Sequence, residues 1–281
     1  RNYAGAMKHN NTFSYLTFFI VISSLLPFNS AYDVTALKRL CYASSLSYLP
    51  LDAMRTSPYY DVARFSPLVQ VEDPITESGA TIFQDDEDES RMIVACRGSA
   101  TPKNFATNLR LNLVPAEKPF DRRGRIHAGF QEAAQGLWGR LAPELQRIQE
   151  SRQLCFTGHS LGGATALLCA GHAGASKSTK VTEVVTFGGP RVGDATFASH
   201  INEELLADCT IRLIIHESDP ILAQNKPLWD RMGFESTGEE IICDPYRSII
   251  YDQSDKPSVV AWNFIDHCQY LGTFVGPRII L

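Results

Sequence analysis

The segment from Leu154 to Ala175 constrains the fold more than any other part of the chain. It begins with the apolar run LCFT, passes through GHSLG at residues 158–162, and continues into the small-residue stretch GGATALLCA. A G-x-S-x-G sequence between a strand and a helix places its serine at a sharp, strained turn. The hydroxyl of Ser160 then projects from the sheet beside a helix N-terminus, which favours developing negative charge. Ser160 is therefore the candidate nucleophile.

The same alternation of strand and helix patterns continues on both sides of this segment. Apolar residues recur at helical spacing in four segments, which are residues 33–49, 127–150, 161–175 and 195–206. Short apolar runs predict strands at residues 80–83, 92–96, 154–157, 181–187, 211–216, 239–243 and 248–251. Strands and helices in alternation predict an α/β fold with a mostly parallel central sheet flanked by helices. The acidic run at residues 85–89 is expected to be a solvated hairpin turn.

The first 31 residues differ in character from the rest. Residues 16–26 (LTFFIVISSLL) are almost wholly apolar, follow Lys8, and precede a small-residue stretch ending at Ala31. This pattern is typical of a secretory signal peptide. The apolar run is short for a membrane span, which needs roughly 20 residues, although an uncleaved anchor or a buried helix is the alternative. We expect a secreted protein with no stable span in the mature chain and one domain over residues 32–281.

The charge and cysteine content limit the partners and the redox chemistry. The net charge of −5 argues against nucleic-acid binding, which needs a basic surface. The cysteines number seven, and a secreted chain should pair some of them. Cys96, Cys155 and Cys169 lie in apolar runs and are expected to be buried thiols. The other four are the disulfide candidates, namely Cys41, Cys209, Cys243 and Cys268.

The partners of Ser160 follow from residue order. A nucleophilic serine needs a base to take its proton, and in G-x-S-x-G enzymes the order is serine, acid, histidine. The strand at residues 211–216 is followed by Glu217 and Asp219, either of which could be the acid. Once the acid is placed there, His267 is the only histidine left downstream. This elimination makes His267 the candidate base.

These segments together resemble the class 3 lipases, a family of the α/β-hydrolase fold. The matching motifs are RGS at 97–99, HAGF at 127–130, FTGHSLGGA at 156–164, TFGGPRVG at 186–193, HESDP at 216–220 and HCQYLG at 267–272. The resemblance implies an α/β-hydrolase fold in which Ser160 is the nucleophile, Asp219 the acid and His267 the base.

The resemblance also implies an oxyanion hole and a lid. Ser99 and the backbone N–H of Leu161 would stabilise the negative oxygen of a tetrahedral intermediate. The short segment 101–109 would form an amphipathic lid helix, with Phe105 and Leu109 on one face. The alternative for this segment is an ordinary surface helix. A lid that opens on lipid is a hypothesis from this pattern.

The sequence therefore predicts a secreted serine ester hydrolase that acts on acylglycerols at a lipid–water interface, without a metal ion or organic cofactor. Within the same chemistry, the alternatives are a phospholipase A1, a mono- or diacylglycerol lipase and a feruloyl esterase. In another class, the chain could be a non-catalytic binding module with a hydrolase fold, although an intact set of Ser160, Asp219 and His267 argues against it. The oligomeric state is left open.

Overall fold

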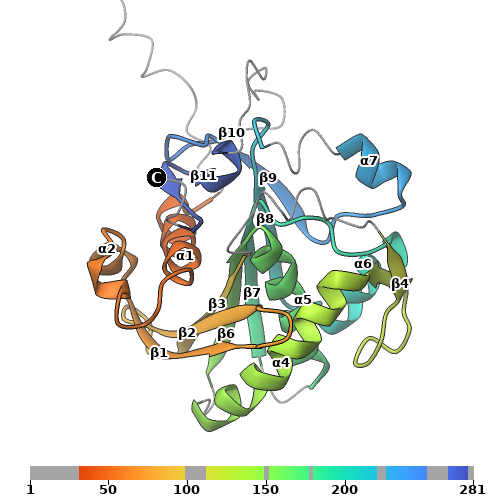
Figure 1. The fold of residues 1–281 in the computed structure, drawn as a ribbon. Helices are drawn as coiled ribbons and strands as arrows, with labels where there is room; N and C mark the ends of the chain where they lie inside the picture. Colours follow the sequence, from red (N-terminus) through yellow and green to blue (C-terminus); the bar gives the residue numbers. More distant parts are fainter. Residues whose placement is uncertain are drawn as a thin grey trace, which may run out of the picture.

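An eight-stranded sheet lies at the centre of the protein (Figure 1). The computed structural model describes residues 32–98, 112–148, 152–176, 180–219, 226–251 and 265–277. In spatial order, the strands are β1 (Phe65–Glu72), β2 (Gly79–Asp85), β3 (Arg91–Arg97), β6 (Gln153–His159), β7 (Lys180–Phe187), β8 (Thr210–Ile215), β9 (Glu239–Cys243) and β10 (Ile250–Tyr251). The run β3-β6-β7-β8-β9 is parallel, while β1, β2 and β10 pair antiparallel at its margins. The predicted mostly parallel sheet is confirmed.

Helices cover both faces of this sheet (Figure 1). The helices are α1 (Val34–Leu46), α2 (Tyr60–Ala63), α4 (Ala128–Ile148), α5 (Leu161–Ala175), α6 (Ala195–His200) and α7 (Lys226–Arg231), with short turns at Met54–Thr56, Ile201–Leu205 and Asp266–Cys268. Two small ribbons, β4 (Leu113–Pro115) with β5 (Arg125–His127) and β11 (Gln269–Tyr270) with β12 (Thr273–Phe274), complete the described elements.

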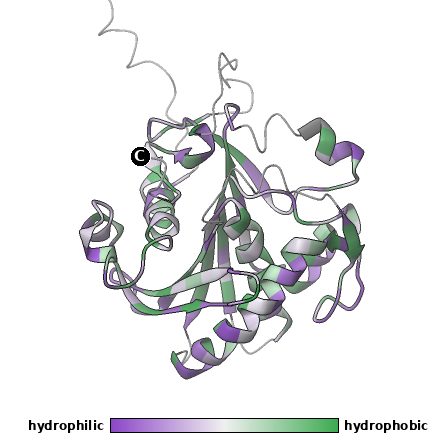
Figure 2. Ribbon diagram, in the orientation of Figure 1, coloured by the Kyte–Doolittle hydropathy of each residue, from purple (hydrophilic) through white to green (hydrophobic). Residues whose placement is uncertain are grey.

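Two apolar clusters result, one on each face of the sheet. In β3, Val94 packs into the cluster beneath α4 and α5, whereas Ile93 and Ala95 pack into the cluster beneath α1. This division follows from the two-residue repeat of a strand. Figure 2 shows apolar residues concentrated along the central strands. Because both sides of β3 and β6 are buried, these strands are nearly continuous apolar runs rather than alternating ones.

The helix α5 has the bounds that its sequence predicted, and the start of α1 has a clear cause. α1 ends at Leu46, three residues before the end that was expected. Asp33 precedes α1, and its Oδ1 accepts hydrogen bonds of 3.0 Å from the backbone N–H groups of Thr35 and Ala36. Such a cap satisfies amides that the first helical turn leaves without partners. α5 is buried from Gly162 to Ala173, which explains its small-residue composition.

One strand was missed, and two expected helices need correction. β1 was not predicted, because Pro67 interrupts its pattern at a register shift on the edge of the sheet. The helix expected from residue 127 begins at Ala128, since His127 ends β5 and its Nδ1 accepts the backbone N–H of Phe130 at 3.2 Å. The helix expected over 195–206 is α6 followed by a π-helical turn, Ile201–Leu205.

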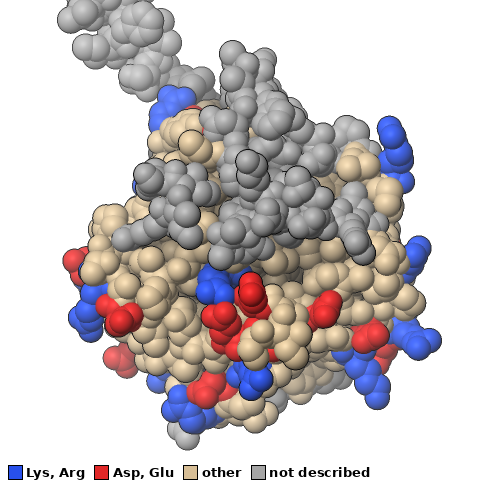
Figure 3. All heavy atoms as spheres, in the orientation of Figure 1, with Lys and Arg blue, Asp and Glu red and all other residues tan. Residues whose placement is uncertain are grey.

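A chain of alternating charges joins α1 to the strands β2, β3, β7 and β8. The turn prediction placed Asp85 in solvent, and it is wrong for this residue. Asp85 is 1% exposed and pairs with Arg39 at 2.5 Å and Arg91 at 3.4 Å. Arg91 also contacts Glu183 at 2.6 Å, and Glu183 contacts Arg212 at 2.8 Å. Acidic and basic side chains are likewise interspersed on the face shown in Figure 3. Buried carboxylates need such partners, because an unpaired charge in the interior is costly.

The expectation of disulfide bonds is wrong in this structure. All seven cysteines are free thiols, and only Cys209 among them is partly exposed. The rule that secreted chains pair their cysteines takes no account of where each thiol lies, and here most occupy interior positions as small apolar side chains. The buried positions predicted for Cys96, Cys155 and Cys169 are confirmed.

No helix within the described ranges is long and apolar enough to cross a membrane. The expected signal peptide at residues 1–31 lies outside the described residues and stays a prediction. The assignment of residues 32–281 to a single domain also stays a prediction.

Candidate active site

Ser160 lies at the turn between β6 and α5, as the pentapeptide predicted. Its backbone has φ 58° and ψ −130°, a conformation that side-chain-bearing residues rarely adopt. The turn is held by the Ser160 N–H, which donates to the carbonyl oxygen of Phe187 on β7 at 3.0 Å. The side chain of Ser160 is 1% exposed, and its Oγ has no hydrogen-bond partner among the described residues. Strained backbone of this kind is concentrated at functional sites.

The two glycines of the pentapeptide permit this turn by letting backbone approach backbone. A Cβ at Gly158 would lie 2.2 Å from the carbonyl oxygen of Gly162, and one at Gly162 would lie 2.3 Å from that of Cys96. Neither contact is compatible with a side chain. Leu161 begins α5, so its N–H belongs to the first helical turn, where amides lack intrahelical partners and attract negative charge.

Asp219 and His267 are in direct contact, although 48 residues separate them. The Nδ1 of His267 lies 2.9 Å from the Oδ2 of Asp219, and both side chains are 0% exposed. Because an ionised carboxylate can only accept, Nδ1 carries the proton and Nε2 is left as the basic nitrogen. Of the two acids that the sequence left open, Asp219 is thus the one the structure brings to His267.

Tyr270 supplies a second hydrogen bond to the same carboxylate oxygen of Asp219. Burial raises the pKa of Asp219, but the charge and hydrogen bond of His267, together with the Tyr270 hydroxyl, outweigh it and lower the pKa to about 2. The carboxylate is therefore ionised at neutral pH. Gly188, at φ +60°, makes room for this arrangement, since a Cβ there would lie 2.2 Å from the Tyr270 hydroxyl.

Three further side chains surround the pair and were not predicted as functional. His159 contacts the backbone of His267 through Nε2 at 2.8 Å and the Tyr48 hydroxyl through Nδ1 at 2.9 Å. His216 contacts the backbone oxygen of Asp266 at 2.7 Å. The motifs GHSLG and HESDP contain both histidines, but nothing in the sequence pairs them with a segment 50 or more residues away.

The remaining predicted site residues lie outside the described residues. These are Ser99 of the expected oxyanion hole and Phe105 and Leu109 of the expected lid, whose roles stay predictions. Within the described ranges, no group of His, Cys, Asp and Glu side chains is arranged to hold a metal ion.

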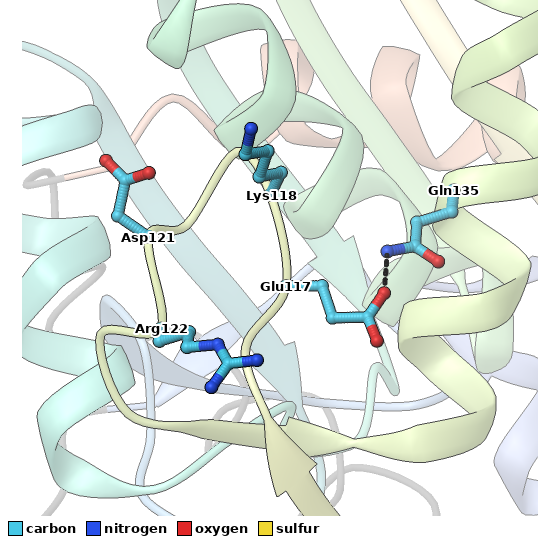
Figure 4. Close-up of a pocket in the computed structure, with 5 residues that line it drawn as sticks. All are labelled: Glu117, Lys118, Asp121, Arg122 and Gln135. Carbon is cyan, nitrogen blue, oxygen red and sulfur yellow. Dashed lines mark hydrogen bonds between the residues drawn. The ribbon is translucent and has the colours of Figure 1, made fainter.

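A separate hollow lies at the loop between β4 and β5 (Figure 4). It is lined by Glu117, Lys118, Asp121, Arg122 and Gln135. Gln135 on α4 donates to Glu117 Oε2 at 3.1 Å, and the Glu117 N–H donates to a second α4 side chain, Gln131, at 2.8 Å. These bonds fasten the loop to α4, and the hollow contains none of the candidate catalytic residues.

Comparison with known proteins agrees with this geometry. The family described as lipase (class 3) matches residues 93–224. A lipase from Rhizomucor miehei is 32% identical over 219 residues, which are 72% of this chain and 57% of the relative. The chain belongs to the class 3 lipase family. A secreted mono- and diacylglycerol lipase from Fusarium solani is 27% identical over 151 residues, which are 52% of this chain and 42% of the relative.

This class 3 lipase family member spans about half the length of the curated relatives it matches. Its fold is also that of a solved triacylglycerol lipase structure whose catalytic centre is a serine protease triad. The two superpose with a TM-score of 0.71 at 22% identity, over 89% of this chain and 98% of the other. The predicted α/β-hydrolase fold and the predicted family are both confirmed.

Proposed function

We propose that the chain is a secreted serine ester hydrolase acting on acylglycerols, with Ser160 as nucleophile, His267 as base and Asp219 as the acid that orients His267. The observation that carries this proposal is the buried bond between His267 Nδ1 and Asp219 Oδ2, together with a serine held at a strained strand-to-helix turn. Membership of the class 3 lipase family supports the same roles.

The first chemical step follows from the protonation states. His267 Nε2 takes the proton of the Ser160 hydroxyl as Oγ attacks the carbonyl carbon of the ester. The imidazole then carries a positive charge, which the ionised Asp219 stabilises across the 2.9 Å contact. Asp219 stays ionised throughout, because its pKa of about 2 lies far below neutral pH.

The tetrahedral intermediate places a negative charge on the former carbonyl oxygen. The Leu161 N–H at the start of α5, together with Ser99, is the proposed donor set for this oxygen. Collapse of the intermediate transfers the proton from His267 to the leaving alcohol and leaves an acyl group on Ser160 Oγ. Water, activated in the same way by His267, then releases the fatty acid.

The proposal that the substrates are acylglycerols rests on relatives, and the proposal that the protein is secreted rests on relatives and on its sequence. One relative is a secreted mono- and diacylglycerol lipase, and the structural neighbour is a triacylglycerol lipase. The apolar segment at residues 16–26 supports export. The lid proposed at residues 101–109, with Phe105 and Leu109 facing lipid, predicts a rise in rate when substrate exceeds its solubility limit. A rate that stays flat across that limit would count against the lid.

The deciding experiment compares wild type with Ser160→Ala on p-nitrophenyl esters of increasing chain length, emulsified triglyceride, diglyceride, phosphatidylcholine and a feruloyl ester. We expect Ser160→Ala to lower kcat on the order of 10⁶-fold. Ser90→Ala is the matched control, because Ser90 is an exposed serine whose hydroxyl donates to Asp88 within its own turn. The relative rates on the panel choose between acylglycerols and the other ester classes.

The non-catalytic alternative predicts a different result. A folded wild type that hydrolyses nothing on the panel, and whose serines a fluorophosphonate does not label, would contradict the proposal and favour a binding module. Labelling that is present in wild type and in Ser90→Ala but absent in Ser160→Ala would support the proposed nucleophile without depending on the choice of substrate.

A further inference from the structure

The turn that carries His267 is not part of the central sheet. It is a short 3-10 turn, Asp266–Cys268, that leads into the small ribbon of β11 and β12. Ser160 directly follows β6, and Asp219 lies four residues after the end of β8, so both are carried by strands of the sheet. A catalytic histidine on such a turn needs contacts that hold its backbone at a fixed position relative to the strands that carry Ser160 and Asp219. An error of about 1 Å in that position can cost on the order of 10²-fold in rate.

Two buried histidines make those contacts. His159 Nε2 lies 2.8 Å from the backbone oxygen of His267, and His216 Nε2 lies 2.7 Å from the backbone oxygen of Asp266. A backbone carbonyl can only accept, so each imidazole donates its Nε2–H. Two consecutive carbonyl groups of the turn are thus held by two separate rings, both of which are 2% exposed or less.

The positions of these two histidines in the chain show which strands the contacts connect to the His267 turn. His159 is the last residue of β6 and directly precedes Ser160. His216 directly follows β8 and lies three residues before Asp219. Each ring therefore extends from the strand that carries one proposed member of the triad to the turn that carries the third.

The surroundings fix the tautomer of His159 and the packing of His216. With the proton of His159 on Nε2, its Nδ1 must accept, and the Tyr48 hydroxyl donates to it at 2.9 Å. Tyr48 fits closely against the chain, since a Cβ at Gly98 would lie 2.2 Å from its hydroxyl. His216 packs edge-on against the Tyr270 ring at 4.9 Å, and Tyr270 also binds Asp219.

The charge state of the rings agrees with this pattern. Burial, followed by the positive charge of nearby His267, lowers the pKa of His159 to about 3. Burial also lowers the pKa of His216, although Asp219 opposes the effect. Both rings are neutral at neutral pH, so each carries one ring proton, and the contact with a backbone carbonyl places that proton on Nε2.

We propose that His159 and His216 are positioning residues that hold the His267 turn in register with Ser160 and Asp219 by donating Nε2–H to the backbone carbonyls of His267 and Asp266. The inference rests on the proposed function, since it assigns a task to these rings only if His267 is the base. Neither ring needs to touch substrate, so removing either donor should change kcat and leave KM unchanged.

Glutamine and methionine replacements test this directly. The two side chains have nearly the same shape, but only glutamine can place an N–H donor where Nε2 lies. In the full chain, we expect His159→Met and His216→Met to lower kcat for a soluble p-nitrophenyl ester on the order of 10²-fold, while His159→Gln and His216→Gln recover most of the loss. The rate of fluorophosphonate labelling of Ser160 should fall and recover in parallel.

His172 provides the matched control. It is also a buried histidine, but it lies on α5, where its ring stacks on Trp138 and meets Phe120 edge-on. In the part of the chain that the structure describes, none of its ring contacts is with the His267 turn. His172→Met and His172→Gln should therefore have the same kcat as each other. A low-field proton resonance from the His267–Asp219 hydrogen bond should shift in the Met variants of His159 and His216 and stay in place in those of His172.

Equal kcat for the Met and Gln variants at His159 and at His216 would overturn the proposal, because packing alone would then explain both rings. Should the Met variants fail to fold, His216→Asn replaces them. Its shorter amide reaches the position of Nδ1 rather than Nε2, so it cannot donate to the backbone oxygen of Asp266. Equal activity of His216→Asn and His216→Gln would again overturn the proposal. Activity that survives in Ser160→Ala would instead refute the proposed function, so the two failures are distinguishable.

Discussion

Replacing His159 with glutamine should make the fold less sensitive to acid. In the folded protein, burial and the neighbouring His267 lower the pKa of His159 from 6.5 to about 3. In the unfolded chain the ordinary value applies. Between these two values, the unfolded chain binds a proton that the folded protein does not, so the free energy of unfolding falls as the pH falls.

The size of this effect follows from the width of the pH interval. One pKa unit corresponds to about 1.4 kcal/mol, so lowering the pH from 6.5 to 5 costs the folded state about 2 kcal/mol through His159 alone. Glutamine does not titrate, yet it can keep a donor toward the backbone oxygen of His267. His159→Gln should therefore lose about 2 kcal/mol less than wild type between pH 7 and pH 5.

Urea unfolding followed by tryptophan fluorescence at the two pH values measures this difference. His172→Gln should show a similar gain, because burial lowers the pKa of His172 to about 4. Arg140→Gln, an exposed change on α4, should behave as wild type does. Asp219 adds nothing in this interval, since its lowered pKa stabilises the fold above about 3.8 and the contribution is lost only as the pH falls toward 2. An equal loss in wild type and His159→Gln would refute the reasoning.

Four further predictions follow from the geometry. Asp219→Asn should keep the fold but lower kcat on the order of 10⁴-fold in an ester assay, because the neutral amide does not stabilise the charged imidazole and can donate to Nδ1, which leaves the ring proton on Nε2. Gly162→Ala should destabilise the protein by about 3 kcal/mol or more in urea unfolding, since the new Cβ would lie 2.3 Å from a backbone oxygen. Asp85→Asn should lower the free energy of unfolding by about 3 kcal/mol, because it leaves Arg39 and Arg91 without their shared carboxylate. A thiol assay should count all seven cysteines only after denaturation, and dithiothreitol should not change Tm.

Sequence patterns predicted the centre of the fold well for a physical reason. The strand, turn and helix around Ser160 are specified by local chemistry, namely apolar runs, two obligatory glycines and small helix-forming residues. The region around Asp219 was also predictable as a strand followed by an acidic turn. In these segments, the residues that determine the structure are adjacent in the chain.

What sequence could not predict depends on contacts between distant segments. Residue order alone left Asp219 and Glu217 open, and the choice of Asp219 came from the family resemblance. The His159 and His216 contacts join residues 108 and 50 positions apart. The seven cysteines show the same limit, because their number says nothing about which thiols lie together. Ser99, Phe105 and Leu109 stay predictions from the family resemblance.

The chain of alternating charges has a consequence for engineering. A strand of seven residues, such as β6, spans roughly 20 Å. Arg91 pairs with the first residue of β6, so Arg91 and its partner Asp85 lie far from the carboxyl end that bears Ser160. Energetic effects at such separations are usually additive. Directed evolution could therefore strengthen the charged edge first and use the added tolerance to remodel substrate contacts at the opposite edge, where most changes would otherwise be eliminated by unfolding.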